Sequence, residues 1–305
     1  MIKDIPNKND FYAVGHALLN QAWDEAMSLL IELNDARDWI DAEDEEEYWR
    51  SSGTRMATAL AIAHQAAEFY LKGRISDVSP FLLIANSARE WPATETDGNI
   101  SFSRFRTVDA QDLVRLHDSC TATPFDQEFR GRLELLRVRR NSIMHTVDKN
   151  IEVKVGELVE TILEIHRTLI GERWIDFRRN ALEESSTGKI FYAEWAGPRL
   201  VLEFRAAQSI LKPSALKKYF SFNAKQRIYI CPECTWSTCR DHEIEFRSAI
   251  LMPNKSDSTA IWCPVCDENQ EVSRSDCGDQ ECRGNVISQE WGRCLTCGEV
   301  QDDDP

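Results

Sequence analysis

The spacing of cysteines constrains the fold of this chain more than any other feature of its sequence. The chain has ten cysteines, and nine of them follow residue 230. Four pairs account for eight of the nine: Cys231–Cys234, Cys263–Cys266, Cys277–Cys282 and Cys294–Cys297. In a reducing compartment, paired cysteines are typical of metal sites, whereas disulfide frameworks belong to oxidising compartments. We therefore expect the end of the chain to fold around bound metal ions.

The same spacing predicts how the cysteines share these ions. Cys231–Cys234 and Cys263–Cys266 are both Cys-Pro-x-Cys motifs. Two intervening residues let both thiolates of a pair bind one ion, and two pairs complete a tetrahedral site. Cys277–Cys282 and Cys294–Cys297 then form a second set of four. We predict two structural Zn²⁺ ions, because a site with four thiolates leaves no open position for catalysis.

A second assignment stays open, because Cys239 and His242 are left over. These two residues could take the place of Cys263–Cys266 in the first set. We prefer the first assignment because paired Cys-Pro-x-Cys motifs resemble the zinc-ribbon family. Each of these two motifs also follows a short apolar segment, at 227–230 and 259–262, that we expect to be a strand.

A different chemistry is indicated by the motif Arg140-Asn141-Ser142-Ile143-Met144-His145, at the end of a helical segment. On a helix, Asn141 and His145 share a face and Arg140 lies on its flank. A guanidinium, an amide and an imidazole then surround one small volume. The alternative is a solvated basic helix end. Arg140 falls on the apolar stripe of its helix, however, where an arginine is unfavourable unless it lines an interface or cleft.

Helical periodicity covers roughly the first 175 residues. Apolar residues recur at helical spacing in Phe11–Trp39, in the alanine-rich Arg55–Ile75, from Phe129 through the motif, and in Ile151–Leu169. The small residues of Arg55–Ile75 favour close helix packing. With short connections between helices, the pattern predicts an antiparallel helical bundle.

This arrangement is similar to the HEPN family over roughly residues 10–172, and its specific residues are Arg140, Asn141 and His145. The resemblance implies a metal-independent endoribonuclease. His145 would act as base on the ribose 2′-OH or as acid on the leaving 5′-oxygen. Arg140 would stabilise charge on the phosphate, and Asn141 would position groups by hydrogen bonding.

The resemblance also implies a homodimer through the bundle, because each chain supplies one histidine and acid–base catalysis needs two. The expected setting is prokaryotic defence or toxin-like RNA cleavage. Glu68 and Lys72 could support the site, with an exposed salt bridge between them as the alternative. Val147 departs from the tyrosine that some HEPN toxins carry at that position, which puts control through that tyrosine in doubt.

The charge is unevenly distributed. The formal net charge is −15, which is unfavourable for a protein that binds nucleic acid through a basic surface. Arginines nevertheless gather on and before the motif helix: Arg104, Arg106, Arg115, Arg130, Arg132, Arg137, Arg139 and Arg140. We expect weak general affinity for nucleic acid and local capture of RNA at the motif.

Three regions are expected in a mainly α chain. Residues 1–176 form a HEPN-like helical bundle, 177–226 connect, and 227–305 form a small β-rich region of tandem zinc ribbons. In the connecting segment we expect a small hairpin from Ile190–Tyr192 and Leu200–Leu202, and then a helix over 206–220. The N-terminal residues lack the apolar stretch of a signal peptide, and no segment has the ~18 apolar residues of a membrane span. We therefore expect a cytoplasmic protein without a membrane partner.

Two other functions fit the same sequence. The bundle could be a non-catalytic HEPN-like dimerisation or nucleotide-binding module, with the zinc ribbons as protein or nucleic-acid adaptors. Alternatively, the zinc ribbons could bind a specific nucleic acid, with the bundle as a scaffold. Trp236, Trp262 and Trp291 could stack on bases, but the acidic surroundings favour contact with a protein regulator or activator.

Overall fold

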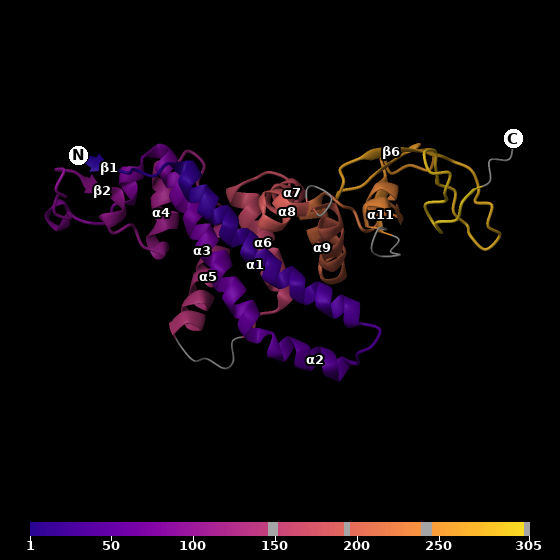
Figure 1. The fold of residues 1–305 in the computed structure, drawn as a ribbon, viewed down its shortest axis with the longest axis horizontal. Coiled ribbons are helices and arrows are strands. Elements are labelled where there is room, and N and C mark those ends of the chain that lie inside the picture. The colour runs from indigo at the N-terminus through magenta and orange to yellow at the C-terminus, as the bar shows by residue number, and fades with distance from the viewer. Residues whose placement is uncertain (146–151, 192–195, 239–245, 302–305) are drawn as a thin grey trace. The chain divides into compact units, whose positions relative to one another are not determined.

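Two structural units make up the chain, Met1–Gly171 and Glu172–Pro305. The computed structural model describes residues 1–145, 152–191, 196–238 and 246–301, and Figure 1 labels many of its helices and strands. The first unit is mostly helical, and the second combines helices with an antiparallel sheet. The expected fold class, a helical bundle followed by a small β-rich region, is confirmed. Within the described ranges, no helix is long and apolar enough to cross a membrane.

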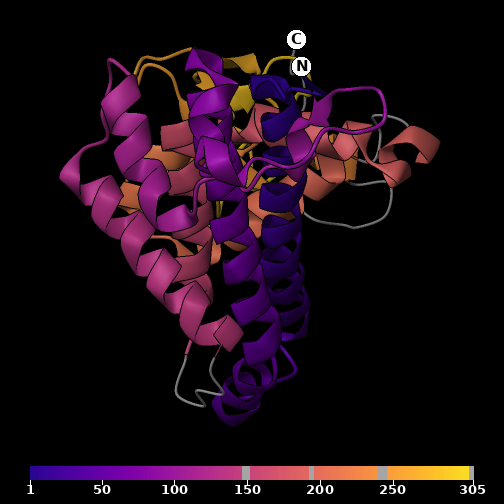
Figure 2. The ribbon, with the colours of Figure 1, turned by 90° about the vertical axis from the view of Figure 1, so that its left-hand side faces the viewer.

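The first unit is organised around its third helix. Its helices are α1 (Lys8–Ala36), α2 (Ala42–Ser51), α3 (Gly53–Val78), α4 (Ala110–Cys120), α5 (Gln127–His145) and α6 (Val155–Leu169). Helix α3 contacts the other five, and Figures 1 and 2 show α1 and α3 running side by side. The strands β1 (Ile2–Lys3) and β2 (Ile100–Ser101) form a short parallel pair. The four long helices expected from the sequence are confirmed, with ends shifted by a few residues.

Helices α1 and α3 approach closely because glycines face tyrosines across their interface. A Cβ atom added to Gly15 would lie 2.7 Å from the ring of Tyr70. On α3, a Cβ atom added to Gly73 would lie 2.6 Å from the ring of Tyr12. Both distances are shorter than van der Waals contact, so these positions require glycine for the observed packing.

Histidines lie inside this bundle. His166 of α6 is buried, with 2% of its surface exposed, and burial lowers the pKa of its imidazole to about 3, helped by the nearby His16. The Nδ1 atom of His16 lies 3.0 Å from the hydroxyl of Tyr70, and burial also lowers the pKa of His16. The folded first unit therefore keeps His166 neutral at pH values where the unfolded chain would protonate it.

We expect the first unit to lose stability in acid through His166. The pKa of a histidine in an unfolded chain is about 6.5, whereas that of His166 in the fold is about 3. Between these two pH values His166 is protonated in the unfolded chain but not in the folded one. As the pH falls through this range, the free energy of unfolding should therefore decrease by about 1.4 kcal/mol per pH unit through this residue. In urea denaturation between pH 7 and 4.5, the free energy of unfolding should depend less steeply on pH in His166→Leu than in the wild type. Equal slopes would contradict the assignment.

The second unit begins with helices and ends with a sheet. The helices are α7 (Trp174–Glu184), α8 (Ser186–Phe191), α9 (Ala196–Ile210), α10 (Pro213–Phe220) and α11 (Pro232–Thr238). The strands are β3 (Ile228–Ile230), β4 (Arg247–Leu251), β5 (Ala260–Trp262), β6 (Asn269–Ser273) and β7 (Ile287–Ser288). These strands form one antiparallel sheet in sequential order. The strands expected before each Cys-Pro-x-Cys motif are confirmed as β3 and β5.

The hairpin expected in the connecting segment is wrong. Leu200–Leu202 lies within α9, and Ile190 lies within α8. Pro198 stands in the first turn of α9, where its fixed φ suits the helix and its missing N–H is not needed. The helix expected over 206–220 is two helices, because α9 ends at Ile210 and Pro213 begins α10.

A buried ion pair joins α7 to α9. The guanidinium of Arg178 donates to both carboxylate oxygens of Glu203, at 3.0 and 2.9 Å, and the two side chains are 2% and 3% exposed. Arg199 adds a third hydrogen bond to Glu203, at 2.8 Å. Because the pair is bidentate and desolvated, removal of one partner leaves a buried charge without compensation.

Glu203→Ala is therefore expected to lower the free energy of unfolding of the second unit by about 3–5 kcal/mol. Glu184→Ala is the matched control, because Glu184 pairs with Lys189 on the surface and such pairs contribute about 0–1 kcal/mol. Urea denaturation followed by circular dichroism measures both variants. A similar small loss in the two would mean that the buried pair does not hold α7 against α9.

Candidate functional site

The first set of cysteines is gathered by the sheet of the second unit. Cys231 directly follows β3 and Cys263 directly follows β5, and both strands pair with β4. Cys234 lies in α11, and Cys266 lies in the turn before β6. The Sγ atoms of Cys231 and Cys266 are 3.7 Å apart, as are those of Cys234 and Cys263. All four sulfur atoms lie within 4.8 Å of one another.

The second set is gathered by the segments around β7. Cys277–Cys282 precedes this strand and Cys294–Cys297 follows it. The Sγ distances are 3.7 Å from Cys277 to Cys297 and 3.9 Å from Cys282 to Cys294. These four sulfur atoms also lie within 4.8 Å of one another. The structure thus brings together the two sets that the cysteine spacing predicts, whereas Cys239 and His242 lie outside the described residues.

Both sets fit one tetrahedral cation each. Sulfur atoms at about 2.3 Å from a common centre, at the corners of a tetrahedron, are about 3.8 Å apart, close to the distances observed. Burial and the neighbouring sulfurs of Cys282 and Cys277 raise the pKa of Cys297 to about 12, so a bound cation would favour the thiolate of this residue. Backbone N–H groups of Val265 and Gly284 donate to Cys263 and Cys282, which helps to fix these sulfurs.

The Arg-Asn-x-x-x-His motif occupies the last two turns of α5. The Nη1 atom of Arg140 donates to Oδ1 of Asn141 at 3.0 Å, and both residues are half-buried. His145 is the last residue of α5, one turn beyond Asn141, and its side chain lies outside the described part of the structure. The structure therefore brings Arg140 and Asn141 into contact and places position 145 on the same side of the helix as Asn141.

Helix α3 supplies an acidic residue near this motif. Nδ1 of the buried His64 lies 3.1 Å from Oε1 of Glu68, whose side chain is 21% exposed. Burial alone would raise the pKa of Glu68. The hydrogen bond with His64 and the positive charges of Lys72 and Arg140 outweigh this effect, so the pKa of Glu68 lies below its ordinary value. Lys72 donates to the hydroxyl of Thr107 at 3.3 Å. The Glu68 side chain is 21% exposed and the charge of Lys72 lowers its pKa, so a Glu68–Lys72 pair stays the alternative to a supporting role in the site.

Comparison with known proteins gave no match to a family model, to a curated protein or to a solved structure. What these residues do is therefore inferred from their own geometry and chemistry.

Proposed function

We propose that this protein is a metal-independent endoribonuclease of the HEPN type that acts as a homodimer in the cytoplasm. The contact between Arg140 and Asn141 in the last turns of α5, with His145 one turn later, is the observation that carries the proposal. These are the residue types that phosphodiester cleavage needs: a cation for the phosphate, an amide to orient groups and a titratable base. A role in prokaryotic defence or toxin-like RNA cleavage rests on family analogy.

The reaction divides among these side chains as follows. His145 of one chain removes the proton from the ribose 2′-OH, whose oxygen attacks the adjacent phosphorus atom. The second histidine of the dimer protonates the 5′-oxygen as its bond to phosphorus breaks. Arg140, oriented by the side-chain oxygen of Asn141, stabilises the charge on the phosphate. The products are a 2′,3′-cyclic phosphate and a 5′-hydroxyl, and DNA is resistant because it lacks the 2′-OH.

The surface of α5 around the motif supports a dimer. Val138 and Met144 stand three residues before and three after Asn141, and they are 47% and 58% exposed. On a helix, residues at this spacing neighbour Asn141 on the same surface. Exposed apolar side chains beside the motif favour a surface covered by a second copy.

The two cysteine sets are proposed to bind structural Zn²⁺. Their sulfur spacing matches Zn–S bonds of about 2.3 Å, and four thiolates leave no position for substrate. The zinc-binding region is proposed to contact a protein regulator or activator. Trp236, which is 60% exposed, packs edge to face with Trp291, and such aromatic pairs are common anchors in protein interfaces.

A non-catalytic adaptor is the second candidate, and the net charge favours it. At −15 the chain repels polyanions as a whole. In this case the bundle would serve for dimerisation or nucleotide binding, and the zinc-binding region would contact a protein or a specific nucleic acid.

Cleavage of RNA in the presence of EDTA tests the nuclease. The wild type is expected to cut total RNA or tRNA and leave 2′,3′-cyclic phosphate ends. Loss of an acid–base or charge-stabilising group should slow cleavage by about 100-fold or more in His145→Ala and Arg140→Ala. Arg139→Ala is the matched control, because Arg139 pairs with Glu157 away from the motif and should leave the rate unchanged.

The outcomes separate the two candidates. Cleavage that persists in His145→Ala would place the active site elsewhere. No cleavage by a folded, metal-loaded wild-type dimer would favour the adaptor. The metal content is measured after the incubation with EDTA, so that loss of activity through unfolding of the second unit is recognised.

Metal analysis tests the zinc sites. Native mass spectrometry is expected to find two zinc ions per chain. Cys263→Ser and Cys282→Ser should each remove one ion, because each substitution breaks a different set of four. Cys120→Ser is the control and should retain both ions. Retention of both ions in Cys239→Ser and His242→Ala would exclude the other ligand assignment, whereas loss of an ion would support it.

A further inference from the structure

A charged cleft lies beside the motif in the first unit. It has a volume of about 410 Å³ and is formed by α3, α4 and α5. Its lining includes His64, Glu68, Arg115, Asp118, Arg130 and Arg137. Three guanidinium groups from two helices line this cleft beside three carboxylates, those of Glu68, Asp118 and Glu134, so its charge is balanced in a chain whose net charge is −15.

The cleft continues the face of α5 that carries the motif. Positions 130, 134, 137, 141 and 145 follow one another at steps of four, three, four and four, so they form one stripe on the helix. With a rise of 1.5 Å per residue, Arg137 stands about 6 Å and Arg130 about 16 Å before Asn141. Glu68 connects the two regions, since it lines the cleft and its pKa responds to Arg140.

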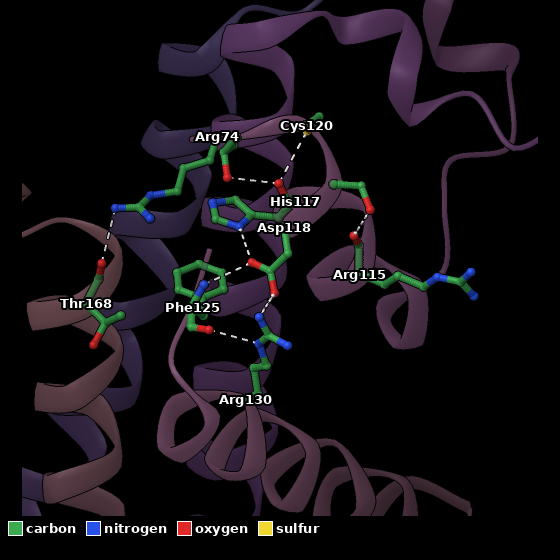
Figure 3. Close-up of polar contacts among 10 residues, drawn as sticks. Arg74, Arg115, His117, Asp118, Cys120, Phe125, Arg130 and Thr168 are labelled. Carbon is green, nitrogen blue, oxygen red and sulfur yellow. Dashed lines mark hydrogen bonds and ion pairs between the residues drawn. The ribbon is translucent and has the colours of Figure 1, made fainter. Parts of the chain in front are cut away.

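A rigid network holds Arg130 in the cleft (Figure 3). Its Nη2 lies 2.9 Å from Oδ2 of Asp118, and its Nε donates to the carbonyl oxygen of Phe125 at 2.9 Å. The other oxygen of Asp118 accepts from the backbone N–H of Phe125 and lies 3.0 Å from Nδ1 of His117. The ring of His117 stacks on Phe125 with centroids 4.1 Å apart. This network fixes one guanidinium before any ligand arrives, which lowers the entropy cost of binding.

The arginines keep donors for an anion. A guanidinium has five N–H donors. Arg137 uses Nε and Nη2 on Glu134, and Arg130 uses Nη2 on Asp118 and Nε on the carbonyl oxygen of Phe125, so neither of these pairings involves Nη1. Arg115 is exposed, and its guanidinium extends away from the network (Figure 3), without an ion-pair partner in the described part of the chain.

We propose that this cleft binds backbone phosphates of the RNA on one side of the cut, so that the substrate runs along α5 from Arg130 to the motif. This inference rests on the proposed nuclease function. Guanidinium groups suit phosphate oxygens because they present paired donors in one plane. Arg130 and Arg137 lie on the helix face that leads to the motif, and the carboxylates within the cleft keep general affinity for polyanions low.

Binding of a 2′-O-methyl RNA oligonucleotide to the wild-type protein tests the proposal, because the blocked 2′-oxygen cannot attack and cleavage plays no part. Fluorescence anisotropy at several salt concentrations gives the affinity. Arg115→Ala and Arg137→Ala should each weaken binding roughly tenfold at low salt, and should lower the slope of log affinity against log salt by about 0.7. Arg132→Ala is the matched control, because Arg132 pairs with Glu128 on the other side of α5 and should bind like the wild type.

Each result decides between alternatives. Equal binding by Arg115→Ala, Arg137→Ala and the wild type would overturn the proposal, as would a larger loss in Arg132→Ala. If a mononucleotide binds as tightly as the oligonucleotide, and Arg115→Ala weakens its binding, the cleft is a site for a free nucleotide and not for an RNA chain. If the wild type cuts no RNA but binds the oligonucleotide through Arg115 and Arg137, the nuclease proposal fails and the RNA cleft stands. If the wild type cuts RNA but Arg115→Ala and Arg137→Ala bind the oligonucleotide normally, the nuclease proposal stands and the RNA cleft fails.

Discussion

Close packing of α1 against α3 is the constraint on which the first unit depends. Tyr70 lies against Gly15 and Tyr12 lies against Gly73, so the two helices can approach only where a side chain is missing. On a helix, Tyr70 and Glu68 face nearly opposite directions. Fixing one side of α3 against α1 therefore presents His64 and Glu68 to α4 and α5 on the other side. The packing of two glycines thus determines which polar groups stand beside the motif of α5.

The second unit is held together differently. Its strands are two to five residues long, too short to bury a large apolar layer by themselves. The Arg178–Glu203 pair and its apolar neighbours fix the helices α7 and α9, while the sheet region relies on two sets of four sulfurs. Local sequence spacing brings the members of each pair together, because two cysteines separated by two intervening residues can bind the same ion.

Features that depend on local periodicity and residue spacing could be predicted from the sequence, whereas features that depend on how the helices pack could not. The long helices and the grouping of the cysteines follow from intervals of three to five residues in the sequence. The hairpin expected from Ile190–Tyr192 and Leu200–Leu202 is wrong, because Pro198 between them stands in the first turn of α9, a position that proline favours as much as a loop. The burial of Glu68 against His64 could not be predicted, since it depends on what covers α3. Nor could the cleft, because Asp118 and Arg130 meet only when α4 folds back on α5.

The sulfur sets give the two units unequal responses to oxidation. Thiolates that bind a metal are still oxidised to disulfides or sulfenic acids, and the ion is released when they are. Within each set, sulfurs from separate pairs lie only 3.7 to 3.9 Å apart, so little movement is needed to join them covalently. The first unit has a buried core of its own that contains no cysteine pair. Oxidation of the sulfurs would therefore release metal from the second unit while the helices that carry Arg140 stay folded.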